Sequence, residues 1–565
     1  MSSRFGTPFI LGALALILGV PFLLRPPASS REALPADQTL IIVTPHVQQI
    51  AKEFGPAFEA WHQKTYGTPA RIDWRGPIGT SDLLKLLQAQ YTTAVLAGDI
   101  KPDGSCEPGV MTFDLLFGGG SFDHGRVKEG VTVRVGADAD GKPRSVTIPM
   151  SVPAGFDQAT LDAWFGENRI GNQYLYDPQQ YWVGSALSAF GIVYNKDCYR
   201  ELGLDEPEQF QDLCRPELAG WVALADPRQS GSIATTFDAI LNNELWAAAR
   251  SEGWAGELDA ALVAEAKDRK SPWVRALWDA RGESIQASWD RGWRLLREMC
   301  ANTRYFTGSS TKPPIDVSQG EAAVGLAIDF YGRGQAQFVL ADGQDPATSR
   351  VGYVDPRGAT YIDADPISVL RGGPNPTLAR RFIEFCMTPE GQALWEFPPR
   401  SMSSQDDMGP QRFSLRRMPI RRIMYEQYRE RFVDKDLAPF EAASDTKPAG
   451  WRRALGVMMG AFAIDVGDAQ RDAWRTLNNA RAAAAAGRVD GAIVRKMEEL
   501  FYAWPTHVMP DGRELEFSPL NVSEITSSWG NREDPTYLPR CRIAYTSFFR
   551  ECYEKVIRLG EEANL

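Results

Sequence analysis

One pattern recurs through the first 370 residues and constrains the fold more than any other feature of the sequence. An apolar run ends in a short loop of small or polar residues, and the spacing of an amphipathic helix follows at once. The loops are Thr44–His46 after "TLIIV", Gly118–Ser121 after "MTFDLLF", Ser230–Ser232 soon after "GWVALADP", and a Gly/Pro loop after "ARIDW". Strands that alternate with helices of this length indicate parallel βα units, and therefore an α/β fold.

These loops are the candidate binding site. In an open α/β sheet the crevice lies beyond the carboxyl ends of the strands, and the free N–H groups and positive helix ends there attract anions or polar oxygens. For any one loop taken alone, a capped tight turn is the favoured interpretation. Four such loops on one side of their sheets shift the balance toward a ligand, to which Arg228 could add charge. The candidate ligand-binding residues are Thr44, His46, Gly119, Gly120, Ser121, Ser230, Gly231 and Ser232.

No catalytic motif accompanies the loops. Gly118–Ser121 is not a P-loop, because no Gly-Lys-Ser/Thr follows it. The four histidines form no HExxH pair, and no G-x-S-x-G elbow occurs. His46 lies in the first loop, where a ligand role and a capping role stay equally open. The sequence therefore predicts a binding protein rather than an enzyme, with an exported enzyme for a small anionic substrate as the alternative.

Composition narrows the class further. At 565 residues the chain is long enough for two or more domains. Its net charge of −11 disfavours binding to a nucleic acid or an anionic membrane, because such binding would need clustered Lys and Arg residues on this chain. The seven cysteines show no CxxC pair and no zinc spacing. An oxidising compartment would permit a Cys198–Cys214 bridge, although buried free thiols are the favoured interpretation.

The N-terminal segment predicts export. Pro8 to Leu24 contains no charged residue and is flanked by Arg4 and Arg25. Seventeen residues is short for a membrane span and long for the apolar region of a signal peptide. A cleaved signal and an uncleaved anchor therefore stay equally open. Either places the protein in the periplasm or on the outer face of the cytoplasmic membrane.

Four segments, in order, resemble bacterial extracellular solute-binding proteins. They are a crossover strand in "YWVGSALSAFGIVYNKDCYRELGL", a ligand loop in "GWVALADPRQSGSIATTF", a returning strand in "SQGEAAVGLAIDFYGR" and a closing helix in "DPISVLRGGPNPTLARRFIEFCMTPEGQALW". The resemblance implies the two-lobed type II periplasmic-binding-protein fold. It also implies that hinge closure traps a solute for an ABC-type importer, with a membrane permease and an ATPase as partners and the binding protein as a monomer.

The expected domain plan takes its two lobes from the resemblance and adds the apolar N-terminal segment and a helical extension that lies beyond the matched region. The plan leaves the role of the last segment open, since it can dock on the first lobe or contact a partner. The expected segments are 1–37 (signal or anchor and linker), 38–185 (lobe 1, first part), 186–329 (lobe 2), 330–420 (lobe 1, return) and 421–565 (helical extension).

Within that family the sequence is most similar to the ferric-iron-binding subgroup. Its histidine falls on His46, and its tyrosine pair falls on Phe330-Tyr331, where Phe330 lacks the phenolate. The implied metal set is His46, Asp329 and Tyr331, with a synergistic anion at Ser230–Ser232, since ferric iron prefers hard oxygen ligands. Ferric iron and a small anion stay equally open as the transported ligand. Tyr331 can instead be an aromatic residue at the hinge that packs on a neighbour. Ser309, Ser310 and Thr311 can also face the cleft, although a plain turn is the favoured interpretation.

Overall fold

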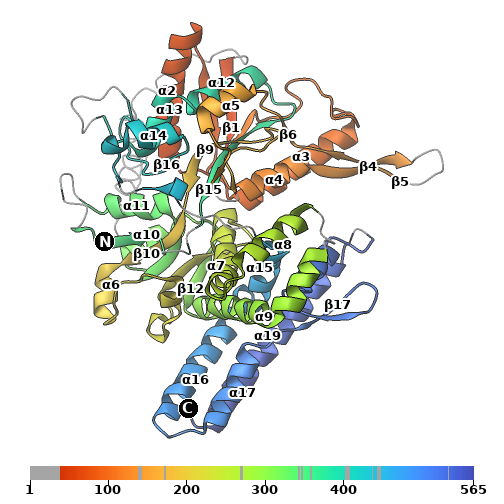
Figure 1. Cartoon of the computed structure of the whole chain (residues 1–565), viewed down its shortest axis with the longest axis vertical. Coiled ribbons are helices and arrows are strands. Elements are labelled where there is room, and N and C mark those ends of the chain that lie inside the picture. The colour runs from red at the N-terminus through yellow and green to blue at the C-terminus, as the bar shows by residue number, and fades with distance from the viewer. Residues whose placement is uncertain are drawn as a thin grey trace, which may run out of the picture.

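Two α/β bodies lie one above the other, and helices from the C-terminal part of the chain extend the second (Figure 1). Body 1 is built on the sheet that contains β1 (Thr39–Val43), and body 2 on the sheet that contains β10 (Phe190–Asn195). The structure is a computed structural model that describes residues 38–137, 143–170, 173–267, 272–340, 344, 348–356, 359, 361–400, 408–435, 437–441, 447–448, 450–531 and 533–565.

The sheet of body 1 runs in the order β16-β9-β15-β3-β1-β2, with β6 beside β15. β1 pairs in parallel with β2 and β3, while β15 pairs antiparallel with β3 and β9. The parallel part confirms the βα units expected from the repeated pattern. The further strands are β2 (Arg71–Arg75), β3 (Leu115–Phe117), β6 (Ser151–Val152), β9 (Val183–Ser188), β15 (Asp363–Leu370) and β16 (Met418–Pro419).

The helices of body 1 cover its sheet with apolar stripes. α2 (Gln48–Tyr66) buries Ile50, Phe54 and Phe58 in the same core as β1 and β3, as their helical spacing predicts. The body also carries the hairpins β4–β5 and β7–β8. The further helices of body 1 and the strands of the two hairpins are α3 (Thr80–Ala97), α4 (Ser121–Glu129), β4 (Val131–Ala137), β5 (Pro143–Ile148), α5 (Gln158–Phe165), β7 (Arg169–Ile170), β8 (Gln173–Tyr174), α12 (Pro376–Cys386), α13 (Pro389–Glu396) and α14 (Arg422–Gln427).

The sheet of body 2 runs in the order β12-β11-β13-β10-β14. β11 pairs in parallel with β12 and β13, while β10 pairs antiparallel with β13 and β14. The elements are α6 (Lys196–Glu201), β11 (Val222–Ala225), α7 (Gly231–Ser251), α8 (Ala255–Lys267), α9 (Pro272–Ala301), β12 (Thr303–Thr307), α10 (Lys312–Gln319), β13 (Val324–Ile328), α11 (Asp329–Phe338) and β14 (Val351–Val354).

The chain crosses between the bodies at three places. Ala189 alone separates β9 of body 1 from β10 of body 2, and the chain returns between β14 and β15. The return therefore lies later than the boundary at residue 330 in the expected domain plan, because β14 pairs with β10. A third crossing lies between Glu441, near the end of body 1, and Lys447, which contacts α7.

From Trp451 onward the C-terminal segment packs mainly on body 2, and Arg452 also contacts Phe122 of body 1. The start of the expected extension differs, because α14, Phe432 and Leu437 pack in the core of body 1. The core residues of the C-terminal segment, among them Trp451 and Trp474, join one apolar cluster with Trp289 and Trp293 of α9. The buried Arg297 of α9 donates hydrogen bonds to the carbonyl oxygens of Phe501 and Ala503. The segment is not purely helical, because it contains the hairpin β17–β18. Its elements are α15 (Trp451–Met459), α16 (Gly467–Ala485), α17 (Gly491–Phe501), β17 (Thr506–Val508), β18 (Glu514–Glu516), α18 (Val522–Ser528) and α19 (Tyr537–Glu562).

Two expectations concern features outside the two sheets. All seven cysteines are free thiols, so the permitted Cys198–Cys214 bridge is not formed. The apolar segment from Pro8 to Leu24 lies outside the described residues, and the predicted signal or anchor stays a prediction. None of the helices described here combines the length and the apolarity needed to cross a membrane.

A buried hydrogen bond between Trp474 and Asn302 tests how strongly the packing of the C-terminal segment on body 2 stabilises the fold. The indole N–H of Trp474 donates to Asn302 Oδ1 at 2.9 Å, whereas the buried indole N–H of Trp293 has no partner among the described residues. We expect Trp474→Phe to lower the free energy of unfolding more than Trp293→Phe by about 1–3 kcal/mol, because Asn302 loses its donor. Urea unfolding of both variants measures the difference, and equal losses would contradict it.

Candidate functional site

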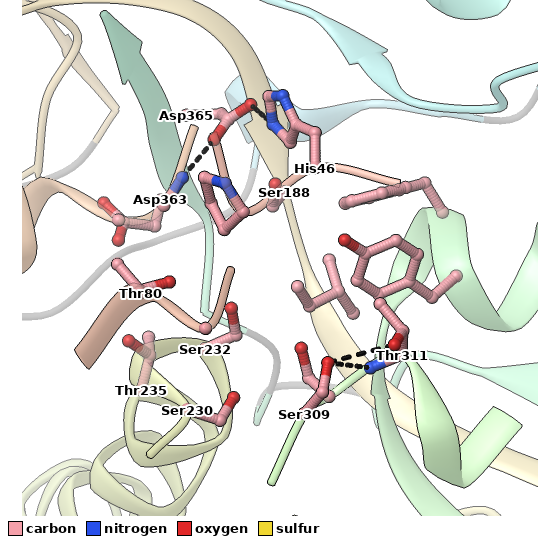
Figure 2. Close-up of a pocket in the computed structure, with 18 of the residues that line it drawn as sticks. His46, Thr80, Ser188, Ser230, Ser232, Thr235, Ser309, Thr311, Asp363 and Asp365 are labelled. Carbon is pink, nitrogen blue, oxygen red and sulfur yellow. Dashed lines mark hydrogen bonds and ion pairs between the residues drawn. The ribbon is translucent and has the colours of Figure 1, made fainter. Parts of the chain in front are cut away.

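A cavity of about 270 Å³ lies between the two bodies. Body 1 lines it with the loops that follow β1, β2 and β3 and with the start of β15. Body 2 lines it with the loops that follow β11, β12 and β13. The carboxyl ends of strands from both sheets therefore face one space, as the sequence pattern predicts. Figure 2 shows the lining side chains around this space.

The structure brings many of the predicted residues to the cavity wall and places the others just behind it. Thr44 Oγ1 donates to the carbonyl oxygen of Phe117 at 2.7 Å, and so joins β1 to β3. The backbone N–H of Ser121 donates to Asp363 Oδ2 at 3.2 Å. Gly231 and Asp329 are also behind the wall. The predicted residues that line it are His46, Gly119, Gly120, Ser230, Ser232 and Tyr331.

Hydroxyl groups from both bodies face the cavity. Ser230 caps α7, because its Oγ accepts from the backbone N–H of Ile233 at 3.4 Å. Ser309 Oγ and Thr311 Oγ1 lie 3.0 Å apart. Both residues line the cavity, so the turn that contains them is part of its wall. Figure 2 shows the hydroxyls of the two bodies on facing sides. The lining serines and threonines are Thr80, Ser188, Ser230, Ser232, Thr235, Ser309, Ser310 and Thr311.

Three helices begin at this wall. α3 begins at the lining Thr80, α7 begins between the lining Ser230 and Ser232, and α10 begins directly after the lining Thr311. The first N–H groups of a helix have no partner within the helix, and the helix dipole places partial positive charge there. In α10, Pro313 and Pro314 have no N–H and the N–H of Lys312 donates to Ser309, so the N–H donors come from α3 and α7. The wall therefore offers hydroxyls, N–H donors and positive helix ends to an anion.

Glycine allows the two bodies to approach closely beside the cavity. A Cβ atom on Gly231, the first residue of α7, would lie 2.5 Å from Asp123 Oδ2 of α4. On the other side, a Cβ atom on Gly79 of body 1 would lie 3.1 Å from the carbonyl oxygen of Gln229. Burial raises the pKa of Asp123 to about 6. The start of α7 thus faces a carboxyl group of the opposite body.

A buried ion cluster forms the body 1 side of the cavity. Asp365 Oδ2 lies 2.7 Å from Arg417 Nη1 and 2.8 Å from His46 Nε2, and Asp365 Oδ1 accepts from the N–H of Gly119 at 2.9 Å. Arg417 Nη2 also donates to Ser188 Oγ at 2.6 Å. Burial opposes ionisation of Asp365, but Arg417 and His46 hold its pKa below the usual value. Burial lowers the pKa of His46, which is therefore neutral at pH 7.

The residues of the predicted metal set differ in how far their ligand atoms are already engaged. His46 Nε2 is engaged with Asp365 and Arg417, which leaves Nδ1 without a partner among the described residues. Burial raises the pKa of Tyr331, so its phenol is protonated. Asp329 is fully buried. Within the described residues, no cluster of three His, Cys, Asp or Glu side chains is arranged to hold a metal ion.

Arg228 lies outside the cavity wall, contrary to its expected role as an added charge. Its guanidinium donates to both oxygens of Asp226 and to Asp465 Oδ1, at 2.8 to 3.0 Å. Asp465 belongs to the C-terminal segment, so Arg228 joins the ligand loop of body 2 to that segment.

Charged groups that organise the site are not among the residues predicted from the sequence. Asp363 and Asp365 occupy alternate positions of a strand, and alternate side chains point to one face; that spacing could have identified them in "DADPISV". Arg417 gave no such signal, because it lies 52 residues beyond its partner in a loop without a motif. Thr235 looked like an interior residue of a helix and lines the wall only because α7 begins there.

Comparison with known proteins agrees with the family resemblance. Residues 162–398 match the family described as bacterial extracellular solute-binding protein. A curated relative, Iron uptake protein A1 of Synechocystis sp. (strain ATCC 27184 / PCC 6803 / Kazusa), is 28% identical over 240 residues, which cover 40% of this chain and 52% of the relative. The chain thus spans about half the length of this curated relative.

Solved structures similar to this chain are periplasmic binding proteins. AfuA from Actinobacillus pleuropneumoniae, with exogenous fructose-6-phosphate bound, has a TM-score of 0.42 and 14% identity and covers 76% of this chain and 99% of its own. Iron-bound HitA from Pseudomonas aeruginosa has a TM-score of 0.41 and 15% identity and covers 73% of this chain and 93% of its own. Likeness at this level says nothing about the ligand.

Asp329 predicts a pH dependence of stability. Both of its carboxylate oxygens lack partners among the described residues, and burial raises its pKa to about 7 from an ordinary value of 3.8. The folded state therefore holds this proton more tightly than the unfolded chain. Its contribution is complete below about pH 4 and is lost as pH rises to about 7, on the order of a few kcal/mol.

We expect Asp329→Asn to flatten this decline, because the amide does not ionise. Urea unfolding between pH 4 and pH 8 measures the slope. Asp99→Asn, at an exposed position, should retain the wild-type slope. An unchanged slope in Asp329→Asn would show that another group carries the dependence.

Proposed function

We propose, on the premise that residues 162–398 carry a domain of the bacterial extracellular solute-binding protein family, that this chain captures a small anion for an ABC-type importer. Family membership implies an exported or periplasmic protein that works with a membrane permease and an ATPase. The two bodies act as the expected lobes. They close over the ligand, and the closed form is presented to the permease.

The observation that carries the proposal is the ring of donors around the cavity. Serine and threonine hydroxyls from both bodies face it, and three helices begin at its wall. Anions bind at helix N-termini through N–H groups and the helix dipole. Donors from both bodies would meet on one anion, and binding would therefore favour the closed arrangement.

The charged groups at the wall support binding rather than catalysis. Arg417 pairs with Asp365, and the neutral His46 is hydrogen-bonded to the same carboxylate and not to a serine hydroxyl. A nucleophilic mechanism needs a serine and its base within hydrogen-bond reach of each other. An exported enzyme on this scaffold stays the alternative and would need a different pair.

Ferric iron is the second candidate ligand, and the name of the curated relative, Iron uptake protein A1, favours it. Tyr331 lines the cavity and Asp329 lies just behind it with unpartnered oxygens. Two costs oppose this candidate: the pKa of Tyr331 is raised, and His46 Nε2 is already engaged. Elemental analysis and native mass spectrometry of protein purified without chelator distinguish stoichiometric iron from a bound anion.

Placing a negative charge at the start of α7 tests the anion site. Ser232 is the second residue of α7 and lines the cavity, so Ser232→Asp should repel an anion there. We expect the rise in melting temperature caused by the anion that native mass spectrometry identifies to be lost. Ser232→Asn has the same size without the charge and should keep most of the rise. A full rise in Ser232→Asp would exclude this loop from the site.

Closure is tested at the close contact between the bodies. Gly231→Ala would push its methyl group against Asp123 Oδ2, and we expect it to hold the bodies apart and weaken ligand binding at least tenfold. Alanine is a better helix former than glycine, so α7 itself should not suffer. Gly256→Ala, at a helical position with open space around it, is the control. Calorimetry measures affinity, and small-angle scattering measures the separation. Wild-type affinity in Gly231→Ala would contradict closure at this contact.

A further inference from the structure

We propose that the C-terminal segment completes the ligand site, by forming a second chamber for the hydroxylated body of an organic anion whose charged group binds in the main cavity. This inference rests on the proposed function and names its ligand class. The chamber has a volume of about 390 Å³ and shares Thr235 and Asp363 with the main cavity. Organic ligands commonly occupy about 300–1,000 Å³, so the main cavity alone suits a small charged group.

Three parts of the chain build the chamber. Body 1 contributes Phe122 of α4 and Tyr361, body 2 contributes Asp238 of α7, and the C-terminal segment contributes Lys447 and Arg452. Each of the two cations touches both bodies. Lys447 Nζ lies 2.9 Å from Asp238 Oδ2 and 3.5 Å from the centre of the Tyr361 ring. Arg452 lies 4.2 Å from the centre of the Phe122 ring and donates to α7.

Aromatic side chains give the chamber its apolar surface. Phe122 and Tyr174 are 41% and 37% exposed, although large apolar residues are usually buried. Trp182 and Tyr361 line the same space. Aromatic faces in a concave pocket supply contact area to the carbon skeleton of a ligand, while a few polar groups fix its orientation.

Two residues that line the chamber each have a buried polar atom without a partner among the described residues. Arg452 Nη1 donates to Thr235 Oγ1 at 2.9 Å and Nη2 to the carbonyl oxygen of Gly231 at 3.1 Å, but its buried Nε has no partner among the described residues. The buried Asp363 Oδ1 also has none, whereas Oδ2 accepts from Ser121. Buried polar groups are normally hydrogen-bonded. Ligand hydroxyls can serve both, because a hydroxyl donates and accepts.

The balance of charge in the chamber favours an uncharged body over a second ion. Lys447 and Arg452 are matched by Asp238 and Asp363. An added ion would upset this balance, whereas hydroxyl groups would not. The donors of the main cavity would hold the anionic group, and Thr235 and Asp363 lie where the two parts of the ligand would meet.

Calorimetric titration of the full-length protein tests the chamber. Two hydroxylated anions, glucose 6-phosphate and gluconate, are each compared with the group that carries their charge, inorganic phosphate and acetate. We expect at least one hydroxylated anion to bind tenfold or more tightly than its simple counterpart, and the pair that shows this gain identifies the charged group.

Variants locate the gain in affinity. Tyr174→Ala and Arg452→Met should each reduce the gain at least fivefold. Tyr174 is exposed and lies outside the main cavity wall, so Tyr174→Ala should also leave the affinity for the simple anion within twofold. Arg453→Met, at the neighbouring position, should retain the gain. Equal affinity for the hydroxylated and simple anions, or a gain that survives both variants, would overturn the chamber alone. Failure of all four anions to bind would overturn the proposed function as well.

Discussion

The buried carboxylate of Asp365 is the constraint on which the binding cleft depends. It is 1% exposed, and a charge taken out of water is stable only when it is paired and hydrogen-bonded. Its partners, His46, Gly119 and Arg417, come from three separate segments. Satisfying this one group therefore fixes the loop after β1, the loop after β3 and the loop that carries Arg417. Removing Arg417 would leave the carboxylate charge of Asp365 inadequately compensated, and the loops that Asp365 holds in place would become less ordered.

The C-terminal segment is part of the architecture of the cleft and not an appendage. Its apolar residues share a core with α7 and α9, and Arg228 joins it to the ligand loop of body 2. α7 is thus supported from behind by the segment and faces the cavity with its first turn. The same segment places Lys447 and Arg452 beside the boundary of the bodies. One stretch of chain therefore both supports α7 and lines the second chamber.

Local patterns predicted much of the fold and part of the site. The stripe of Ile50, Phe54 and Phe58 follows helical spacing, and the loops of small residues follow from strand-to-helix transitions. These features depend on neighbours in the sequence. The pairing of Arg417 with Asp365 depends on tertiary folding alone, and so does the turn of Arg228 away from the cavity. Ser309 and Thr311 reach the wall because β12 lies beside β11, an order of strands that no local signal contains.

The third crossing of the chain sets a geometric limit on any motion of the two bodies. Only five residues lie between Glu441 and Lys447, so six residue-to-residue steps join them. A fully extended chain advances by about 3.3–3.6 Å per step. The crossing can therefore span about 20 Å and acts as a tether of fixed maximum length. Shortening it would restrict the opening of the cleft before any residue of the cavity wall is altered, so the range of travel can be tuned independently of the chemistry of recognition.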